Sequence, residues 1–167
     1  FYKNKPTIAL LNIGLEEIKG NEVLKNTFTN LKKTEINNFD FQGYVEGNQI
    51  MNGDIDVIVT DGFTGNIALK TAEGTANFIT KNLRNSLSKL SILFSYRRLK
   101  KFKEKLDPRK YNGAIFLGLQ GPVVKSHGST DALGFSHSID VCRKIVKANL
   151  IEKIKSNLIN IDASTNK

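Results

Sequence analysis

The sequence is poor in cysteine and contains no long apolar run. Cys142 is the single cysteine among 167 residues, so the chain cannot form an internal disulfide, and a metal site built from thiolates is not expected. No apolar run reaches the roughly 18 residues that a membrane-spanning helix requires, and no secretory signal sequence opens the chain. With 40% hydrophobic residues available for a core, these absences predict a cytoplasmic globular protein.

Motifs that would assign a chemistry directly are also missing. The chain has no Walker loop, no GxGxxG, no metal-ligand spacing and no Ser-His-Asp arrangement. His137 and Cys142 both fall inside a predicted helix, where we expect them to pack or to face solvent. We therefore expect neither a bound metal nor an organic cofactor, and a dinucleotide-binding domain is disfavoured.

The chain carries a formal net charge of +9, but this charge is unevenly distributed. Residues 1–66 hold 6 basic and 9 acidic side chains, whereas residues 67–167 hold 19 and 7. The stretch from Tyr96 to Lys110 alone holds 8 basic and 2 acidic residues. A nucleic-acid-binding module is one interpretation, yet the segment YNGAIFLGLQG that follows is typical of a core and not of base contacts. We expect a local interaction surface and no nucleic acid.

Short apolar segments alternate with helical patterns along the chain. TIALLNIG, FDFQGYVEG and DIDVIVT read as strands, and the third is apolar on both faces, as in parallel sheets covered by helices on both sides. A helix is expected from about Asn21, and GAIFLGLQGPVVKSHGS reads as one strand broken by Gly121–Pro122. This alternation predicts an α/β fold.

Two further helical regions complete the predicted fold. Apolar residues at spacings of three or four predict a helix from about Asn66 to Leu90, followed by a second helix that ends at Asp107–Pro108, so that 66–107 would form a helical hairpin. A long helix is expected over 131–158, with Ile139, Ile145 and Leu150 buried. We assign 1–160 to one α/β domain and 161–167 to a tail. The chain begins at Phe1 without a methionine and enters a strand almost at once, so we expect structure to precede it.

Four polar, glycine-containing segments follow the predicted strands. They are Asn12–Gly14 running to Lys19–Gly20, Glu46–Gly47, Asp61–Asn66 and Lys125–Ser129. Ligands of open α/β sheets bind beyond the carboxyl ends of the strands, so parallel strands would bring these four loops together. Glycines that expose backbone amides, a helix N-terminus and basic side chains suit the binding of an anion.

The segment DGFTGN fits this interpretation best. Thr64 or Asn66 would cap the following helix, Gly62 and Gly65 would expose the backbone, and Lys70 lies one turn further on. The alternative is an ordinary glycine-rich turn with a helix cap. For His127, between Lys125 and Gly128–Ser129, a purely structural role is equally open.

Three long segments closely resemble one known family. LLNIGLEEIKGNE, GYVEGNQIMNGDIDVIVTDGFTGNIALKTAEG and YNGAIFLGLQGPVVKSHGS occur in the same order in the phosphate acyltransferase family, PlsX. The resemblance runs from about Thr7 to the last helix and corresponds to the C-terminal half of that family. Related phosphate acetyltransferases that use coenzyme A, and dehydrogenases of similar fold, match these segments less well.

The resemblance implies that a fatty acyl group is transferred from acyl carrier protein to inorganic phosphate. It also implies a Rossmann-like three-layer αβα sandwich similar to isocitrate dehydrogenase and phosphotransacetylase, a homodimer and peripheral membrane attachment. The family's functional positions fall on Lys19 and Asn66, with His127 a weaker assignment. From the four loops, the substrate-binding candidates are Asn12, Gly14, Glu46, Asp61, Gly62, Thr64, Gly65, Lys70, Lys125 and Ser129.

The stretch SILFSYRR has no counterpart in the family motifs, so its role rests on its own composition. An apolar cluster is followed directly by basic residues, which favours a helical tip that enters a bilayer while the cations meet anionic headgroups. The alternative is that the cluster packs against the domain or a second subunit. The residues predicted to contact the membrane are Ile92, Leu93, Phe94, Arg97, Arg98, Lys100 and Lys101. The same basic surface would attract an acidic carrier protein.

Overall fold

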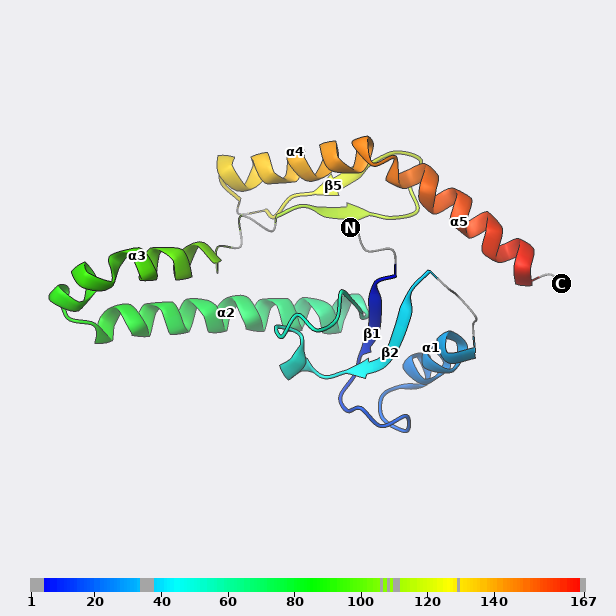
Figure 1. Cartoon of the computed structure of the whole chain (residues 1–167), viewed down its shortest axis with the longest axis horizontal. Helices are drawn as coiled ribbons and strands as arrows, with labels where there is room; N and C mark the ends of the chain where they lie inside the picture. Colours follow the sequence, from blue (N-terminus) through cyan, green and yellow to red (C-terminus); the bar gives the residue numbers. More distant parts are fainter. Residues whose placement is uncertain are drawn as a thin grey trace. The chain divides into compact units, whose positions relative to one another are not determined.

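The computed structural model describes residues 5–33, 38–105, 107, 109, 112–128 and 130–165. Side chains are described within these ranges except at 89–94, 103, 105 and 159–165, which leaves the predicted membrane residues Ile92, Leu93 and Phe94 outside the described side chains. The chain forms two compact units, Phe1–Thr75 and Ala76–Lys167. It is a mixed α/β structure, as the sequence predicts (Figure 1).

The first unit contains a parallel three-stranded sheet. Its strands are β1 (Thr7–Leu11), β2 (Asp40–Val45) and β3 (Val57–Val59), in the order β2-β1-β3. Both pairings are parallel, which confirms the predicted arrangement for these three strands. The remaining elements are helix α1 (Glu22–Lys33), the short 3-10 helix η1 (Gly47–Gln49) and the start of helix α2.

The core of this unit lies around β1. Ala9, Leu10 and Leu11 are buried because β1 is paired on both edges, and Leu10 is only 2% exposed. Helix α1 packs on β2 through Phe28, whose ring centroid lies 4.7 Å from that of Tyr44. Asn21 accepts a hydrogen bond from the amide of Leu24 (2.9 Å) and caps α1, which confirms the predicted helix start.

One prediction about the third strand is wrong. We expected DIDVIVT to be buried on both faces, but β3 covers three residues at the edge of the sheet, and Val59 is 46% exposed. An edge strand has a neighbour on one side only, so fewer helices and strands cover its side chains.

Two long helices follow the sheet. Helix α2 (Gly62–Ser86) begins four residues before the predicted start at Asn66 and ends before Leu90, and helix α3 (Lys89–Lys105) follows after Leu87 and Ser88. The earlier start places Thr64 and Asn66 inside α2, so the prediction that one of them caps the helix is wrong. The end of α3 at Lys105 agrees with the predicted stop before Asp107–Pro108.

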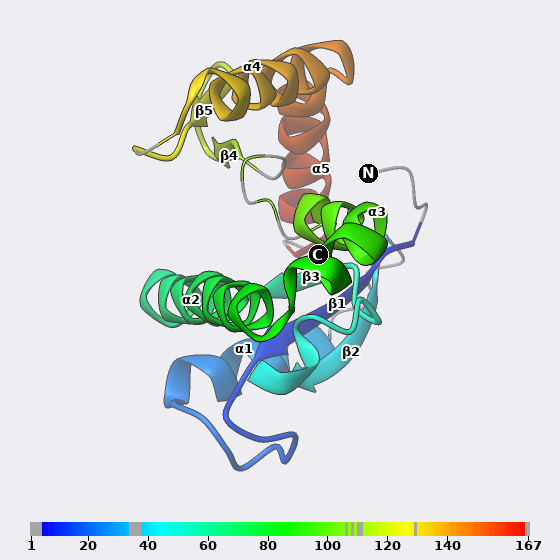
Figure 2. The ribbon, with the colours of Figure 1, turned by 90° about the vertical axis from the view of Figure 1, so that its left-hand side faces the viewer.

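The second unit contains a pair of antiparallel strands, β4 (Ala114–Phe116) and β5 (Val123–Lys125). The prediction of one strand interrupted at Gly121–Pro122 is therefore wrong, because the chain turns back on itself between the two strands. Helix α4 (Ala132–Lys147) lies along this pair, which both views show (Figures 1 and 2).

The single helix predicted over 131–158 is also wrong. It is divided into α4 and α5 (Leu150–Thr165), and α5 runs into the stretch predicted as a tail. Asn149 has a φ of 51°, and its amide donates to the carbonyl of Val146 (3.0 Å), so this left-handed residue ends α4. Ile145 is buried as predicted, whereas Ile139 is 57% exposed and Leu150 only half-buried.

Across the part of the chain that the structure describes, none of the helices has both the length and the apolar character needed to cross a membrane.

The burial of Leu10 gives a test of the first unit's core. Leu10→Ala removes a side chain that is 2% exposed and should lower the free energy of unfolding by about 3 kcal/mol. Ile13→Ala is the matched control, because Ile13 is 79% exposed and its truncation should change the stability by less than about 0.5 kcal/mol. Urea-induced unfolding followed by circular dichroism measures both, and equal effects would contradict this core.

Candidate functional site

The carboxyl ends of the three parallel strands bring three of the four predicted loops to one edge of the sheet. Leu11 pairs with Val45, and Leu10 pairs with Val59. When these registers are continued past the strand ends, Asn12 lies level with Glu46 on one side and with Asp61 on the other. The hydrogen bond from the amide of Asn12 to the carbonyl of Val45 (2.9 Å) extends the ladder to this level.

Asn12 is the buried centre of this edge. Its side chain is 6% exposed and uses both of its polar groups on the loop that follows: Oδ1 accepts from the amide of Ile13 (2.9 Å), and Nδ2 donates to the carbonyl of Lys19 (3.2 Å). Gly20 has a φ of 88°, and a Cβ there would lie 2.5 Å from Oδ1 of Asn12. The loop from Ile13 to Gly20 is therefore closed by one amide side chain and needs glycine at its end.

Lys19 is exposed at the end of this closed loop. Its amide donates to the carbonyl of Glu16 (3.0 Å), which forms a turn. A Cβ on Gly14 would lie 2.6 Å from Oε2 of Glu16 and 3.1 Å from Cγ of Lys19, so both side chains lie over Gly14. The absence of a side chain at Gly14 leaves room for the stem of Lys19.

Glu46 occupies the same level after β2 and is half-buried. Its amide donates to Oε1 of Gln49 (3.0 Å), and its carbonyl accepts from the amide of Gln49 (3.0 Å). These two bonds hold the turn of η1 directly behind the strand end.

Asp61 caps α2, which corrects the predicted cap. Its Oδ1 accepts from the amide of Thr64 (2.9 Å), and its carbonyl accepts from the amide of Gly65 (2.9 Å). Hydrogen bonds from the hydroxyl and the amide of Thr64 hold the pKa of the Asp61 carboxyl below its ordinary value. The ionised carboxylate therefore already neutralises the N-terminus of α2, where the sequence predicts an external anion.

The other predicted residues of this segment lie along the first turns of α2. Gly62, Thr64 and Asn66 are exposed, whereas Gly65 is half-buried against Thr60, whose Cγ2 a Cβ would meet at 2.7 Å. Lys70 forms an ion pair with Glu73 (2.7 Å). The cation expected one turn beyond the loop is thus paired along its own helix.

The fourth predicted loop belongs to the second unit and follows an antiparallel strand. Lys125 ends β5, His127 is exposed in the loop, and Ser129 lies outside the described residues. The expectation that this loop follows a strand of the parallel sheet is therefore wrong. Its strand pairs only in the separate two-stranded sheet.

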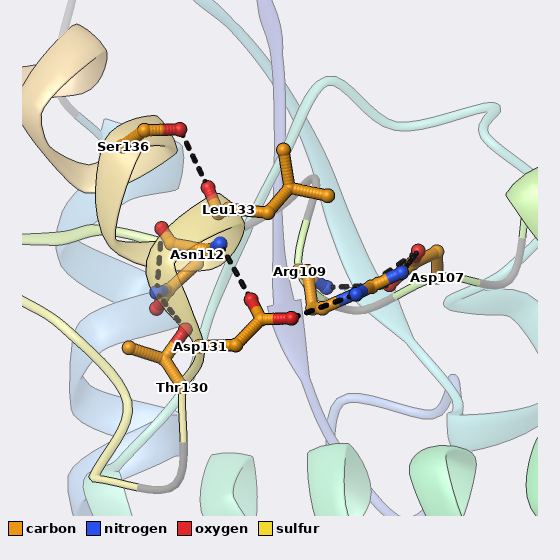
Figure 3. Close-up of polar contacts among 8 residues, drawn as sticks. Asp107, Arg109, Asn112, Thr130, Asp131, Leu133 and Ser136 are labelled. Atoms are coloured by element: carbon orange, nitrogen blue, oxygen red, sulfur yellow. Dashed lines mark hydrogen bonds and ion pairs between the residues drawn. The ribbon is translucent and has the colours of Figure 1, made fainter.

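The side chain of Asn112 holds this loop in place, and Figure 3 shows how it lies beside Thr130. Asn112 was not among the site residues predicted from the sequence. Its Nδ2 lies 2.9 Å from Oγ of Ser126, 3.0 Å from Oγ1 of Thr130 and 2.9 Å from the carbonyl oxygen of Gly134. Its Oδ1 accepts from the amide of His127 (2.9 Å). A signal was present in the Asn-Gly pair just before β4, inside a segment read only as core.

Arg109 was predicted only as part of a basic surface, yet it forms two ion pairs (Figure 3). Its Nη2 lies 2.6 Å from Oδ2 of Asp107, and its Nη1 lies 2.8 Å from Oδ2 of Asp131. Asp131 also caps α4 by accepting from the amide of Gly134 (2.9 Å). The pKa of Arg109 is raised and that of Asp131 lowered by these bonds, so both stay charged and largely neutralise each other.

Within the described ranges, no cluster of three or more His, Cys, Asp or Glu side chains is placed to hold a metal ion. Cys142 and His137 are both half-buried on α4.

The first unit has polar loops at the carboxyl ends of three parallel strands, which is where open α/β sheets bind their ligands. Comparison with known proteins narrows this class. Residues 2–153 match the model of a family described as "Fatty acid synthesis protein", and the chain belongs to this family.

Individual relatives carry a more specific name. The chain is 62% identical over 156 residues to the phosphate acyltransferase of Pelagibacter ubique, a match that covers 90% of this chain and 47% of the relative. It is 45% identical over 160 residues to that of Agrobacterium fabrum (93% and 45%), and 46% over 163 residues to that of Sinorhizobium fredii (95% and 47%). The chain thus spans about half the length of these relatives.

The cap of α2 predicts how thermal stability depends on pH. Asp61→Ala should lower the melting temperature at pH 7, whereas Asp61→Asn, which keeps a capping oxygen, should retain most of it. Because the folded-state pKa of Asp61 is depressed, the carboxylate stabilises the fold above about pH 4 and loses this effect as the pH falls through the folded-state pKa. Melting curves by circular dichroism should show the difference between wild type and Asp61→Ala vanishing in acid. A difference that is independent of pH would contradict this cap.

Proposed function

We propose that this chain is part of a phosphate acyltransferase that transfers a fatty acyl group from acyl carrier protein to inorganic phosphate. The observation that carries the proposal is the 62% identity to a protein of that name over 90% of the chain. The family description, fatty acid synthesis, agrees with an acyl substrate. These names favour the acyl carrier protein reaction over a coenzyme A-dependent acetyltransferase and over a nucleic-acid-binding module.

The proposed reaction needs no nucleophile from the protein. A phosphate oxygen attacks the thioester carbonyl and forms the new C–O bond, and the carbonyl oxygen becomes an oxyanion. When the carbonyl re-forms, the C–S bond breaks, and the thiolate leaves with its electron pair and takes up a proton. The protein must hold phosphate and thioester together and stabilise the oxyanion. The lack of a Ser-His-Asp motif and of a second cysteine is consistent with this chemistry.

The electrostatics of the polar edge support a central role for Lys19. Glu46 and Asp61 place two acidic side chains level with Asn12, and the carboxylate of Asp61 already occupies the N-terminus of α2. A phosphate at this edge therefore requires a nearby cation. Lys19 supplies one from a loop that Asn12 closes, and the Lys19 side chain is exposed for binding. We assign Lys19 to phosphate and the oxyanion, and Asn66, exposed on α2, to the thioester carbonyl.

The remaining predicted residues take supporting roles in this proposal. Asn12 and Asp61 form the loop and the helix cap that position Lys19 and Asn66. His127, from the loop held by Asn112, would contact the reacting groups. Residues proposed to line the substrate are Gly14, Glu46, Gly62, Thr64, Gly65, Lys70, Lys125 and Ser129.

The larger architecture follows from the same family assignment. We propose that residues 1–160 form part of a Rossmann-like three-layer sandwich, that α2 and α3 form a protruding hairpin, and that the enzyme is a homodimer. A cavity of about 530 Å³ is evidence for the proposed hairpin, because both helices line it: α2 contributes Leu83, and α3 contributes Leu99. The reaction is proposed to take place in the cytoplasm at the membrane surface.

The basic face of α3 supports peripheral membrane attachment. Its cations are exposed, and none of them has an acidic partner among the described side chains; they are Arg97, Arg98, Lys100 and Lys101. Arg109, by contrast, is neutralised by two aspartates and contributes little free charge. Basic residues near an anionic surface contribute about 1 kcal/mol each, so this face would bind reversibly. The same face would speed the encounter with an acidic carrier protein.

The catalytic assignment is tested in a chimaera in which this chain replaces the matching part of the Pelagibacter ubique phosphate acyltransferase. Lys19→Ala and Asn66→Ala should each lower turnover by about 10²-fold, as the loss of an oxyanion donor does in other enzymes. The measurement is the phosphate-dependent release of free carrier-protein thiol from acyl carrier protein.

Matched controls separate chemistry from general damage. Lys32→Ala removes an exposed lysine of α1 that pairs with Glu17, and Asn82→Ala removes an exposed asparagine of α2. Both should leave turnover within about twofold, as should Cys142→Ser. Normal turnover in Lys19→Ala and Asn66→Ala would show that the site is wrongly assigned.

Membrane attachment is tested by co-sedimentation of the chain with vesicles. The wild type should bind phosphatidylglycerol vesicles better than phosphatidylcholine vesicles, and both Lys100→Glu/Lys101→Glu and Leu93→Glu/Phe94→Glu should lose most binding. Lys147→Glu/Lys153→Glu makes the same change of charge as the lysine pair, but on α4 and α5, and should bind nearly as wild type. If the wild type does not bind phosphatidylglycerol vesicles better than phosphatidylcholine vesicles, membrane attachment is contradicted. The apolar cluster would then pack in a core or at a subunit interface.

A further inference from the structure

The loop that carries His127 is fastened by one side chain. Asn112 lies between α3 and β4, and its amide reaches Ser126, Thr130 and Gly134 as well as the backbone of His127. Figure 3 shows its bond to Thr130. These partners begin directly after β5, at Ser126, and end inside the first turn of α4, at Gly134, so one amide spans the whole connection from β5 to α4.

Both polar atoms of the Asn112 side chain form hydrogen bonds. Nδ2 has two protons for three acceptors at 2.9 to 3.0 Å, so two of these acceptors share one proton. Oδ1 accepts from the amide of His127 at 2.9 Å. The side chain is half-buried. Glutamine is the one other amino acid whose side chain combines two amide protons with an acceptor, and it is longer by one methylene group.

The surrounding packing holds Asn112 against α4. A Cβ on Gly113 would lie 3.2 Å from Cα of Ser138, and a Cβ on Gly134 would lie 2.1 Å from Oγ1 of Thr130. Gly113 also has a φ of 115°. Both positions need glycine for the segment, the loop and the helix to approach this closely.

We infer that Asn112 is a positioning residue for the reaction: it holds the backbone of the loop so that His127 is presented in one fixed geometry. This inference rests on the proposed function, in which His127 contacts the reacting groups. Asn112 itself touches the loop and α4, and not the substrate. A loop displaced by about 1 Å can cost about 10²-fold in rate, which is enough to make such a residue essential.

The positioning is measured first by NMR on the chain with labelled histidine, which has signals only from His127 and His137. Asn112→Ala removes the acceptor of the His127 amide, so this resonance should shift and its proton should exchange at least about tenfold faster. Ile145→Ala is the control, because it loosens the packing of buried Ile145 on α4 without touching the loop, and it should leave the His127 amide resonance in place. An unchanged His127 amide in Asn112→Ala would overturn the inference.

The effect on catalysis is measured in the chimaera. Asn112→Ala should lower kcat and kcat/KM by about 10 to 10²-fold together, with little change in the KM for phosphate, because an alignment and not a binding contact is lost. Ile145→Ala should keep its kcat per folded molecule. His127→Ala and the double variant complete a cycle: if Asn112 acts through His127, the second substitution should add almost nothing to the first. Additive losses would overturn the inference.

A second set of variants serves if Asn112→Ala does not fold. Ser126→Ala and Thr130→Val each remove one acceptor of Nδ2 and leave Asn112 in place, and each should shift the His127 amide in the same direction by a smaller amount. No shift in either variant would overturn the inference. If the amide shifts but neither Asn112→Ala nor His127→Ala alters turnover, the loop is held for stability alone and the inference fails. The proposed function is still decided separately by Lys19→Ala and Asn66→Ala.

Discussion

The pairing of β1 on both of its edges is the constraint on which the candidate site depends. Because β2 and β3 run parallel to it, all three strands end at one edge, and the two registers place Asn12, Glu46 and Asp61 at the same level. The same double pairing buries Leu10 and its neighbours, which form the core beneath this edge. The strand β1 therefore lies at the centre of both the core and the candidate site. The loops at this edge start from positions that the hydrogen bonds between the strands fix.

Two asparagines perform the same task in the two units. Asn12 closes the loop that carries Lys19 by bonding to the loop backbone through both its oxygen and its nitrogen. Asn112 closes the loop that carries His127: its oxygen accepts from the amide of His127, and its nitrogen donates to the carbonyl of Gly134 in α4. A glycine beside each amide lets the chain approach: Gly20 lies against Asn12, and Gly134 lies against Thr130, to which Asn112 bonds. A side chain that offers both a donor and an acceptor can fasten a backbone that has no regular secondary structure, and such loops can present a reactive residue in a fixed geometry.

The cap of α2 shows how far sequence reasoning reaches at a site. The six residues DGFTGN correctly marked a strand end, a helix start and a polar edge, but Asp61, Thr64 and Asn66 all suit a cap, and the structure uses the first. The choice moves the helix start by four residues and fills its N-terminus with an internal carboxylate. Under the proposed function, this internal carboxylate makes the exposed cation Lys19 more important for binding phosphate. No rule of local propensity distinguishes the three candidate caps.

Local patterns in the sequence determined the α/β class, the three parallel strands, the start of α1 at Asn21 and the positions of the polar loops, because alternation of apolar residues and capping residues act over a few positions. The tertiary structure alone decided the rest. The segments β4 and β5 form two strands and not one because they pair with each other, and this pairing exists only in the folded chain. The break between α4 and α5 depends on the left-handed backbone of Asn149, while the residues on both sides of it keep a helical pattern. Asn112 was hidden for the same reason: its partners lie 14 to 22 residues away, and only folding brings them to one amide.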